Sequence, residues 1–185
     1  CYQAVNQQNH ILNGKEIREG GELEEVVNHL NLIRVMAKIN HKAKVVSENN
    51  FPTAAGLASS ASGLAALSVA GAKAAGLNLS KKELSILARR GSGSASRSIE
   101  GGFVEWRKGE KTDGTDSYAT QISPQDHWDF RIITVITSAK EKKIKSRAGM
   151  AQTVATSAYY KDWLATVEED LKKVREGILK KDFRL

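Results

Sequence analysis

Cysteine is almost absent from this sequence, which carries a single one, Cys1, among 185 residues. One thiol cannot form an internal disulfide or a cysteine-based zinc site, so a reducing, cytoplasmic setting is expected. Proline occurs only twice, which excludes collagen-like and proline-rich chains. Aromatic residues make up 6% of the chain and do not alternate with basic ones, so no stacking platform for single-stranded nucleic acid is expected.

Long apolar runs are also missing. The uncharged stretch 49–72 is long enough to span a bilayer, which takes about 20 mostly apolar residues. Asparagine, proline, threonine and serine interrupt it, however, and most of its apolar residues are alanines. No basic segment followed by an apolar one opens the chain, so no signal peptide is predicted. We therefore expect no membrane partner, and a loop that leads into a tightly packed helix.

A surplus of positive charge is present instead. The chain has 28 basic and 21 acidic side chains and a net charge of +7. Such a surplus favours anionic partners, which include phosphorylated metabolites, acidic lipids and nucleic acid. The charge is spread along the chain, with 11 basic and 7 acidic residues before position 91 and 17 and 14 after it. Because a nucleic-acid footprint is usually clustered, we expect no nucleic-acid partner, although a basic nucleic-acid-binding module remains the alternative from another protein class.

Apolar periodicity predicts a helix over residues 22–40 and a strand over 43–48. Small, turn-permissive residues follow, and good helix formers begin near residues 59–60, where the next helix should start. Ser80 and Glu83 form a capping box that predicts the start of a further helix. The glycine- and serine-rich residues after it do not favour a free-standing helix.

Strand-like runs at 101–107, 117–122 and 129–137 are separated by turn residues, which makes an antiparallel sheet plausible. A helical pattern returns from Ala148. The four histidines lack metal-ligand spacing, so no zinc site is predicted, and His29 is expected at the surface. The fold class that we predict is α+β, with a mixed sheet covered by helices.

The segment PTAAGLASSASG at 52–63 is the first candidate site. Its glycine-containing turn ends in Ser59 and Ser60 at the start of a helix, where unpaired backbone N–H groups and the helix dipole can hold a phosphate. No Gly-Lys-Ser/Thr follows, so it is not a Walker A loop. A tight helix entry that only permits close packing is the alternative.

The segment ARRGSGSASRS at 88–98 is the second candidate site. Ser92, Ser94, Ser96 and Ser98 offer hydroxyl groups beside Arg97, whose guanidinium can hold a carboxylate or phosphate through two hydrogen bonds. A serine-rich connection with surface arginines is the alternative, and the spacing alone slightly favours it. The basic run KIKSRAGM at 143–150 is weaker still, because such runs are usually solvated.

Taken together, PTAAGLASSASG, ARRGSGSASRSIEGGFVEW and SRAGM followed by TVATSAYYKDW resemble diphosphomevalonate decarboxylases, which belong to the GHMP superfamily of small-molecule kinases. The resemblance runs in order from about Leu12 to Phe183. It implies ATP-dependent decarboxylation of mevalonate 5-diphosphate to isopentenyl diphosphate, with ADP, phosphate and CO2 released, in the mevalonate route to isoprenoids. A related superfamily enzyme that acts on mevalonate or mevalonate 5-phosphate is the alternative.

The resemblance also implies two sets of site residues, with ATP and Mg²⁺ as cofactors. The backbone of the first set should hold the ATP phosphates, with Ser59 or Ser60 near the Mg²⁺ ion: Gly56, Leu57, Ala58, Ser59, Ser60, Ala61 and Ser62. The second set should hold the substrate: Ser92, Ser94, Arg97, Ser146 and Arg147. Arg97 should bind the carboxylate of the substrate, and Ser146 and Arg147 should bind its diphosphate.

For domain organisation, the resemblance implies a GHMP-type ATP-binding domain over residues 1–138, similar in fold to a ribosomal protein domain. Residues 139–185 would begin a second α+β domain, and a homodimer is expected. Two family motifs have no match in the sequence: an Ala-Asn-Ile-Ala-Leu-x-Lys-Tyr-Trp-Gly-Lys stretch and an Asp-Ala-Gly-Pro motif whose aspartate activates the C3 hydroxyl. We therefore assign no catalytic residue within these 185 residues and expect this chain alone to be inactive.

Overall fold

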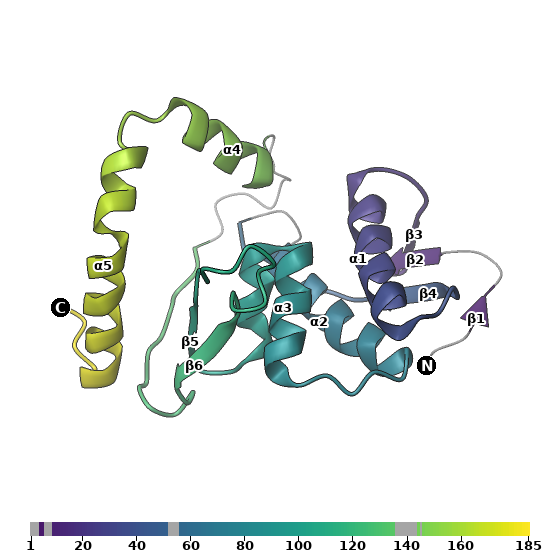
Figure 1. The fold of residues 1–185 in the computed structure, drawn as a ribbon, viewed down its shortest axis with the longest axis horizontal. Helices are drawn as coiled ribbons and strands as arrows, with labels where there is room; N and C mark the ends of the chain where they lie inside the picture. The colour runs from purple at the N-terminus through teal and green to yellow at the C-terminus, as the bar shows by residue number, and fades with distance from the viewer. Residues whose placement is uncertain (1–3, 6–8, 52–55, 136–143, 145) are drawn as a thin grey trace.

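The structure, a computed structural model, describes residues 4–5, 9–51, 56–135, 144 and 146–185. Several positions singled out above lie outside them, namely Cys1, residues 52–55 of the first candidate site, and Lys143 and Lys145 of the basic run. Twelve elements are assigned in the described ranges, from the short strand β1 (Ala4–Val5) to the long helix α5 (Tyr160–Lys180) (Figure 1).

A four-stranded mixed sheet forms the N-terminal part, in the order β1–β4–β2–β3. Strands β2 (Asn9–Leu12) and β3 (Lys15–Ile17) make an antiparallel hairpin, whereas β2 and β4 (Lys42–Ser47) run parallel. Parallel strands require a crossover connection, and α1 (Gly21–Ala37) lies between β3 and β4 in the chain. The predicted mixed sheet, the helix at 22–40 and the strand at 43–48 are confirmed.

Helices α1, α2 (Ser59–Ala74) and α3 (Lys81–Gly91) pack against one another beside this sheet (Figure 1). One cluster of buried residues joins α1 to α3, and a second joins α2 and α3 to the segment after α3. The members of the first are Val26, Leu30, Ile33 and Leu87, and those of the second are Leu64, Ala65, Ala88 and Ala95. The small alanines of the second cluster let α2 and α3 approach closely.

Local sequence signals set the helix starts as predicted. The Ser80 hydroxyl accepts a hydrogen bond from the Glu83 N–H at 3.3 Å, and the Ser80 N–H donates to Glu83 Oε2 at 2.8 Å. These two bonds satisfy donors that a helix start would otherwise leave unpaired. Helix α2 begins at Ser59, inside the uncharged stretch 49–72. Among the described residues, no helix combines the length and the hydropathy that crossing a bilayer requires.

A short 3-10 helix, η1 (Gly93–Ile99), and a two-stranded antiparallel sheet follow α3. Strand β5 (Phe103–Trp106) pairs with β6 (Ala119–Ser123), which confirms two of the three predicted strands. Buried Ser85 connects these elements, because its hydroxyl accepts from the Ala119 N–H at 2.8 Å and donates to the Ser96 carbonyl at 3.0 Å. The serine-rich segment is therefore held on α3 and the sheet.

The third predicted strand, at 129–137, is wrong for the part that is described. Residues 129–135 form neither helix nor strand, and Ile132, Ile133 and Val135 are exposed. A strand needs a neighbour to pair its backbone groups, and within the described ranges β6 pairs only with β5. Residues 136 and 137 lie outside the described ranges.

The C-terminal helical pattern forms two helices, α4 (Ser146–Thr156) and α5. Figure 1 shows α5 beside the β5–β6 sheet, where Arg175 forms a bidentate ion pair with Glu105 at 2.8 and 2.5 Å. The His127 Nε2–H donates to the Ile178 carbonyl at 2.9 Å. The apolar stripe predicted for α5 forms, yet Trp163 is 56% exposed and Val174 58%, so this face is uncovered here.

Candidate functional site

The first part of the site is the start of α2. The preceding residues Gly56 and Ala58 both adopt a left-handed backbone, with φ of 96° and 55°. The N-cap residue, Ala58, makes no side-chain hydrogen bond to this helix end, and the first turn has no acidic residue. The Ala61 N–H bonds the Ala58 carbonyl at 2.9 Å, and the Ser62 hydroxyl donates to the Ser59 carbonyl at 3.1 Å. A positive helix end without a carboxylate beside it suits an anion.

The second part is the serine segment, which we define as Ser92–Ser98. Ser92 has an extended backbone that ends α3 and begins η1. Its hydroxyl lies 3.2 Å from that of Ser94, so the two half-buried hydroxyls form a pair. Ser96 is buried and donates to the Gly93 carbonyl at 2.7 Å, so this serine serves the local fold. Arg97 is exposed on the same turn of chain.

Arg147 lies against the beginning of the serine segment although it is far away in sequence. Its Nη2 donates to the Gly91 carbonyl at 3.1 Å, and its Nη1 lies 3.8 Å from Glu25 Oε1. Ser146, the first residue of α4, is exposed beside it. The structure thus places Arg147, one of the two predicted diphosphate-binding residues, beside Gly91, which directly precedes Ser92.

The two parts of the site share one scaffold. A Cβ atom added to Gly91 would lie 3.3 Å from Leu64 Cδ1, so the end of α3 touches the second turn of α2. Leu64 is five residues after Ser59, or about 8 Å along the helix axis at 1.5 Å per residue. The start of α2 and the serine segment therefore lie near each other in the molecule.

A cavity of about 510 Å³ lies where the β2–β3 hairpin meets the end of β4. Asn13 closes it, because its N–H donates to the Ser47 carbonyl at 3.0 Å and its side-chain oxygen accepts from the Asn49 N–H at 2.7 Å. The sequence did not predict this cavity, since it depends on the parallel pairing of β2 with β4. The only sequence signal was the Asn13-Gly14 turn, which is typical of hairpins.

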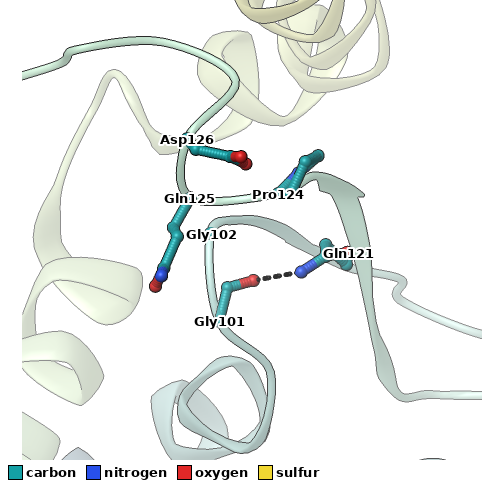
Figure 2. A pocket seen from close by; sticks show the side chains of 6 residues that line it. All are labelled: Gly101, Gly102, Gln121, Pro124, Gln125 and Asp126. Atoms are coloured by element: carbon teal, nitrogen blue, oxygen red, sulfur yellow. Dashed lines mark hydrogen bonds between the residues drawn. The ribbon is translucent and has the colours of Figure 1, made fainter.

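A smaller cavity of about 330 Å³ lies at the open end of the β5–β6 sheet. Figure 2 shows its lining, where the Gln121 side-chain amide donates to the Gly101 carbonyl at 2.8 Å. Its six lining residues are Gly101, Gly102, Gln121, Pro124, Gln125 and Asp126. With a single charged residue, which is acidic, this lining does not suit the anionic ligands that the other parts of the site favour.

His29 is buried rather than exposed, so its predicted surface position is wrong. It is 1% exposed and shares the buried face of α1 with Val26 and Ile33, at helical spacings of three and four. Its Nε2 lies 2.8 Å from the Ser68 hydroxyl on α2. Burial, together with the charge of Arg90, lowers the pKa of His29 to about 4. The spacing from Val26 was the signal that could have predicted this burial.

The lowered pKa of His29 predicts a loss of stability in mild acid. An unfolded chain binds this proton near the ordinary pKa of 6.5, whereas the folded chain resists it until about pH 4. The contribution of His29 to the free energy of unfolding should therefore be complete above about pH 6.5. The free energy of unfolding should then fall by roughly 2 to 3 kcal/mol as the pH drops toward 4. Urea unfolding at several pH values measures this fall.

The matched control for that prediction is His41, which is exposed on the loop after α1. The His29→Asn variant should show a flatter profile between pH 4 and 6.5, and His41→Asn should keep the profile of the unaltered chain. An equal slope in His29→Asn and the unaltered chain would contradict the assignment. The comparison also separates His29 from His10, whose pKa is lowered by burial as well and is raised in part by Glu22.

The oxygen ligands available at the α2 start would bind Mg²⁺ only together with a phosphate group. Within the described ranges, no group of three or more histidine, cysteine or acidic side chains could hold a metal ion. Mg²⁺ commonly keeps several waters and binds through one or two protein ligands plus substrate phosphates. The Ser59 and Ser60 hydroxyls at a phosphate-type helix end suit that mode.

Two family models and several known proteins are similar to this chain. A model of the diphosphomevalonate decarboxylase-like N-terminal domain matches residues 1–119, and one of the mevalonate 5-diphosphate decarboxylase C-terminal domain matches residues 132–185. The diphosphomevalonate decarboxylase of Gibberella zeae is 49% identical over 146 residues, which are 78% of this chain and 38% of that protein.

Solved structures are similar over nearly all of the chain. The mevalonate diphosphate decarboxylase of Staphylococcus aureus is 41% identical with a TM-score of 0.83, and the match covers 97% of this chain and 54% of that one. A structure described as MDDEF in complex with MVAPP, AMPPCP and magnesium is 45% identical with a TM-score of 0.84, over 98% and 55%. The chain spans about half the length of these structures and less of the curated relative. Because the N-terminal model alone covers more than half of its residues, the chain belongs to the diphosphomevalonate decarboxylase family.

Proposed function

We propose that the protein to which these residues belong decarboxylates mevalonate 5-diphosphate with ATP and yields isopentenyl diphosphate, ADP, phosphate and CO2. The observation that carries the proposal is the joint scaffold of the α2 start and the serine segment, with Arg147 bound to the Gly91 carbonyl. Two anionic molecules could bind side by side on such a scaffold. The relatives, whose names carry this activity, support the same reading.

The chemistry explains which side chains are needed. ATP transfers its γ-phosphoryl group to the C3 hydroxyl oxygen, the hydroxyl proton is released, and ADP leaves. The C1–C2 bond then breaks, its electron pair forms the C2–C3 double bond, the C3–O bond breaks, and phosphate and CO2 leave. Positive groups must hold the carboxylate and the phosphates close together against their mutual repulsion. The magnesium ion would neutralise part of the phosphate charge.

Each part of the site has a proposed role in this reaction. The backbone from Gly56 to Ser62 would hold the ATP phosphates, with Ser59 or Ser60 near Mg²⁺. Arg97 would bind the carboxylate, where its two parallel N–H groups match the two oxygens. Ser92 and Ser94 would donate to carboxylate or diphosphate oxygens, and the pair at the start of α4, Ser146 and Arg147, would bind the diphosphate.

The cavity at the end of β4 would take the nucleoside part of ATP. It directly precedes the phosphate-binding segment in the chain, since Asn49 is seven residues before Gly56. Its lining offers side-chain amides, a hydroxyl and one carboxylate, that of Glu48, which can bond the uncharged base or ribose but would not suit a phosphate. We further propose that the protein is a cytoplasmic homodimer. The boundary between the two domains of each subunit would lie near residues 138–139.

The test is a turnover assay with the gene product that contains these residues. ATP and Mg²⁺ would be supplied with mevalonate, mevalonate 5-phosphate or mevalonate 5-diphosphate, and isopentenyl diphosphate and CO2 would be measured. We expect turnover with the diphosphate only, and none from the 185-residue chain by itself. Product from mevalonate or its monophosphate at an equal rate would contradict the proposal.

A further inference from the structure

His29 joins the two helices that carry the site. Its Nε2 bonds Ser68 on α2, nine residues after the start of that helix at Ser59. On its other side the ring lies against Gly91, the last residue of α3, which is directly followed by the serine segment. The imidazole, at 1% exposure, is thus enclosed between the phosphate-type helix and the entrance to the serine segment.

The hydrogen bonds determine which edge of the His29 ring lies against which helix. The Ser68 hydroxyl donates to the Leu64 carbonyl at 2.7 Å, so it accepts from the His29 Nε2–H. The Nδ1 atom then has only a lone pair, and it has no hydrogen-bond partner among the described residues. A buried acceptor of this kind contributes no hydrogen bond to the packing of α1 on α3, so this edge of the ring acts through its van der Waals contact with Gly91.

Only glycine fits at position 91 in this arrangement. A Cβ atom there would lie 2.7 Å from Nδ1 and 3.2 Å from Cε1 of His29. Cβ atoms in proteins do not approach other heavy atoms as closely as 2.7 Å, so a side chain at this position would have to displace either the ring or the end of α3. The ring therefore acts as a spacer that, together with the Leu64 side chain of α2, sets the distance between Gly91 and α2.

We propose that His29 is a positioning residue, which holds the serine segment at a fixed distance from the phosphate-binding start of α2. The inference rests on the proposed function for its consequence in catalysis. Transfer of a phosphoryl group between two bound molecules depends steeply on their separation, and a displacement of about 1 Å can cost roughly 100-fold in rate. His29 touches neither molecule and acts through Ser68 and Gly91.

The test compares His29→Ala with a control of similar burial, Ile33→Val, which trims the same face of α1 where Ile33 packs toward Gly71 of α2. In the gene product, His29→Ala should lower kcat by about tenfold while the KM values for ATP and mevalonate 5-diphosphate change less than threefold. Each molecule keeps its own binding groups, and only their separation changes. Ile33→Val should keep the kcat of the unaltered protein.

A double substitution makes the test sharper. Gly91→Ala alone should lower kcat because its Cβ meets the ring, whereas Gly91→Ala in the His29→Ala background should restore part of the loss, since the methyl group then fills the vacated space. Such coupling is what two residues in direct contact show. Equal effects of Gly91→Ala in both backgrounds would overturn the proposal, as would an unchanged kcat in His29→Ala.

Hydrogen exchange gives a readout that does not depend on activity. The Ser92 and Ala95 N–H groups bond the carbonyls of Ala88 and Ser92, at 3.0 and 2.9 Å. Their exchange should be at least tenfold faster in His29→Ala than in Ile33→Val, and equal exchange would contradict the spacer role. If the unaltered gene product forms no isopentenyl diphosphate, the proposed function fails, and the exchange result still decides whether His29 positions the serine segment.

Discussion

Replacing Arg97 with alanine is expected to lower kcat/KM for mevalonate 5-diphosphate by about 100-fold or more, the usual cost of removing one charge-stabilising donor group. In the proposed complex its guanidinium holds the carboxylate that leaves as CO2. Arg97→Lys should lose less activity, because it keeps the charge but not the two parallel donors. Steady-state kinetics on the gene product would measure both variants.

The stability of the Arg97 variants should hardly change, because the side chain is exposed. Arg131→Ala is the matched control, since Arg131 is also exposed and pairs only with Asp129 among the described residues. Its kcat/KM should equal that of the unaltered protein. If Arg97→Ala retained the same kcat/KM as Arg131→Ala, the carboxylate-binding role would be wrong.

Replacing Gly102 with alanine is expected to destabilise the fold by about 3 kcal/mol or more. Its φ of 74° is left-handed, which costs other residues about 1 to 2 kcal/mol. The added Cβ would also lie 2.4 Å from the Ser123 carbonyl oxygen and 2.8 Å from the Gln125 nitrogen. These are backbone atoms at the end of β6, so relief would require the β5–β6 sheet to move. Urea unfolding of the chain measures the loss.

The neighbouring glycine is the control for this prediction. Gly101 has no positive φ, and a Cβ there would meet nothing within 4 Å. Gly101→Ala should therefore change the free energy of unfolding by less than about 0.5 kcal/mol. Similar losses in the two variants would show that the close approach of Gly102 to β6 does not govern the stability of this sheet.

Local signals made much of the fold predictable. The helix start at Ser59 and the capping box at Ser80 depend only on neighbours in sequence, and both are confirmed. The third strand at 129–137 was wrong over its described part because strand formation depends on a partner that periodicity does not reveal. The α2 start and the serine segment could be identified from their composition, and the family resemblance gave them roles.

Contacts between distant residues could not be predicted. Arg147 bonds the Gly91 carbonyl across 56 positions, and the cavity beside Asn13 needs the pairing of β2 with β4. The basic run around Arg147 looked solvated by itself, so the resemblance alone singled that residue out. For His29, two local signals disagreed. Its acidic neighbours on α1 suggested an exposed position, whereas its spacing from Val26 suggested a buried one.

Ala58 has a consequence for the phosphate-binding segment. It is an alanine in the left-handed region, with φ of 55° and ψ of 37°, where glycine would avoid a cost of about 1 to 2 kcal/mol. Glycine would also sample many other backbone angles before a ligand arrives. The methyl group narrows that range, so less conformational entropy remains to be lost when an anion binds. Part of the folding energy is thus held as strain in a segment that is already shaped for its ligand.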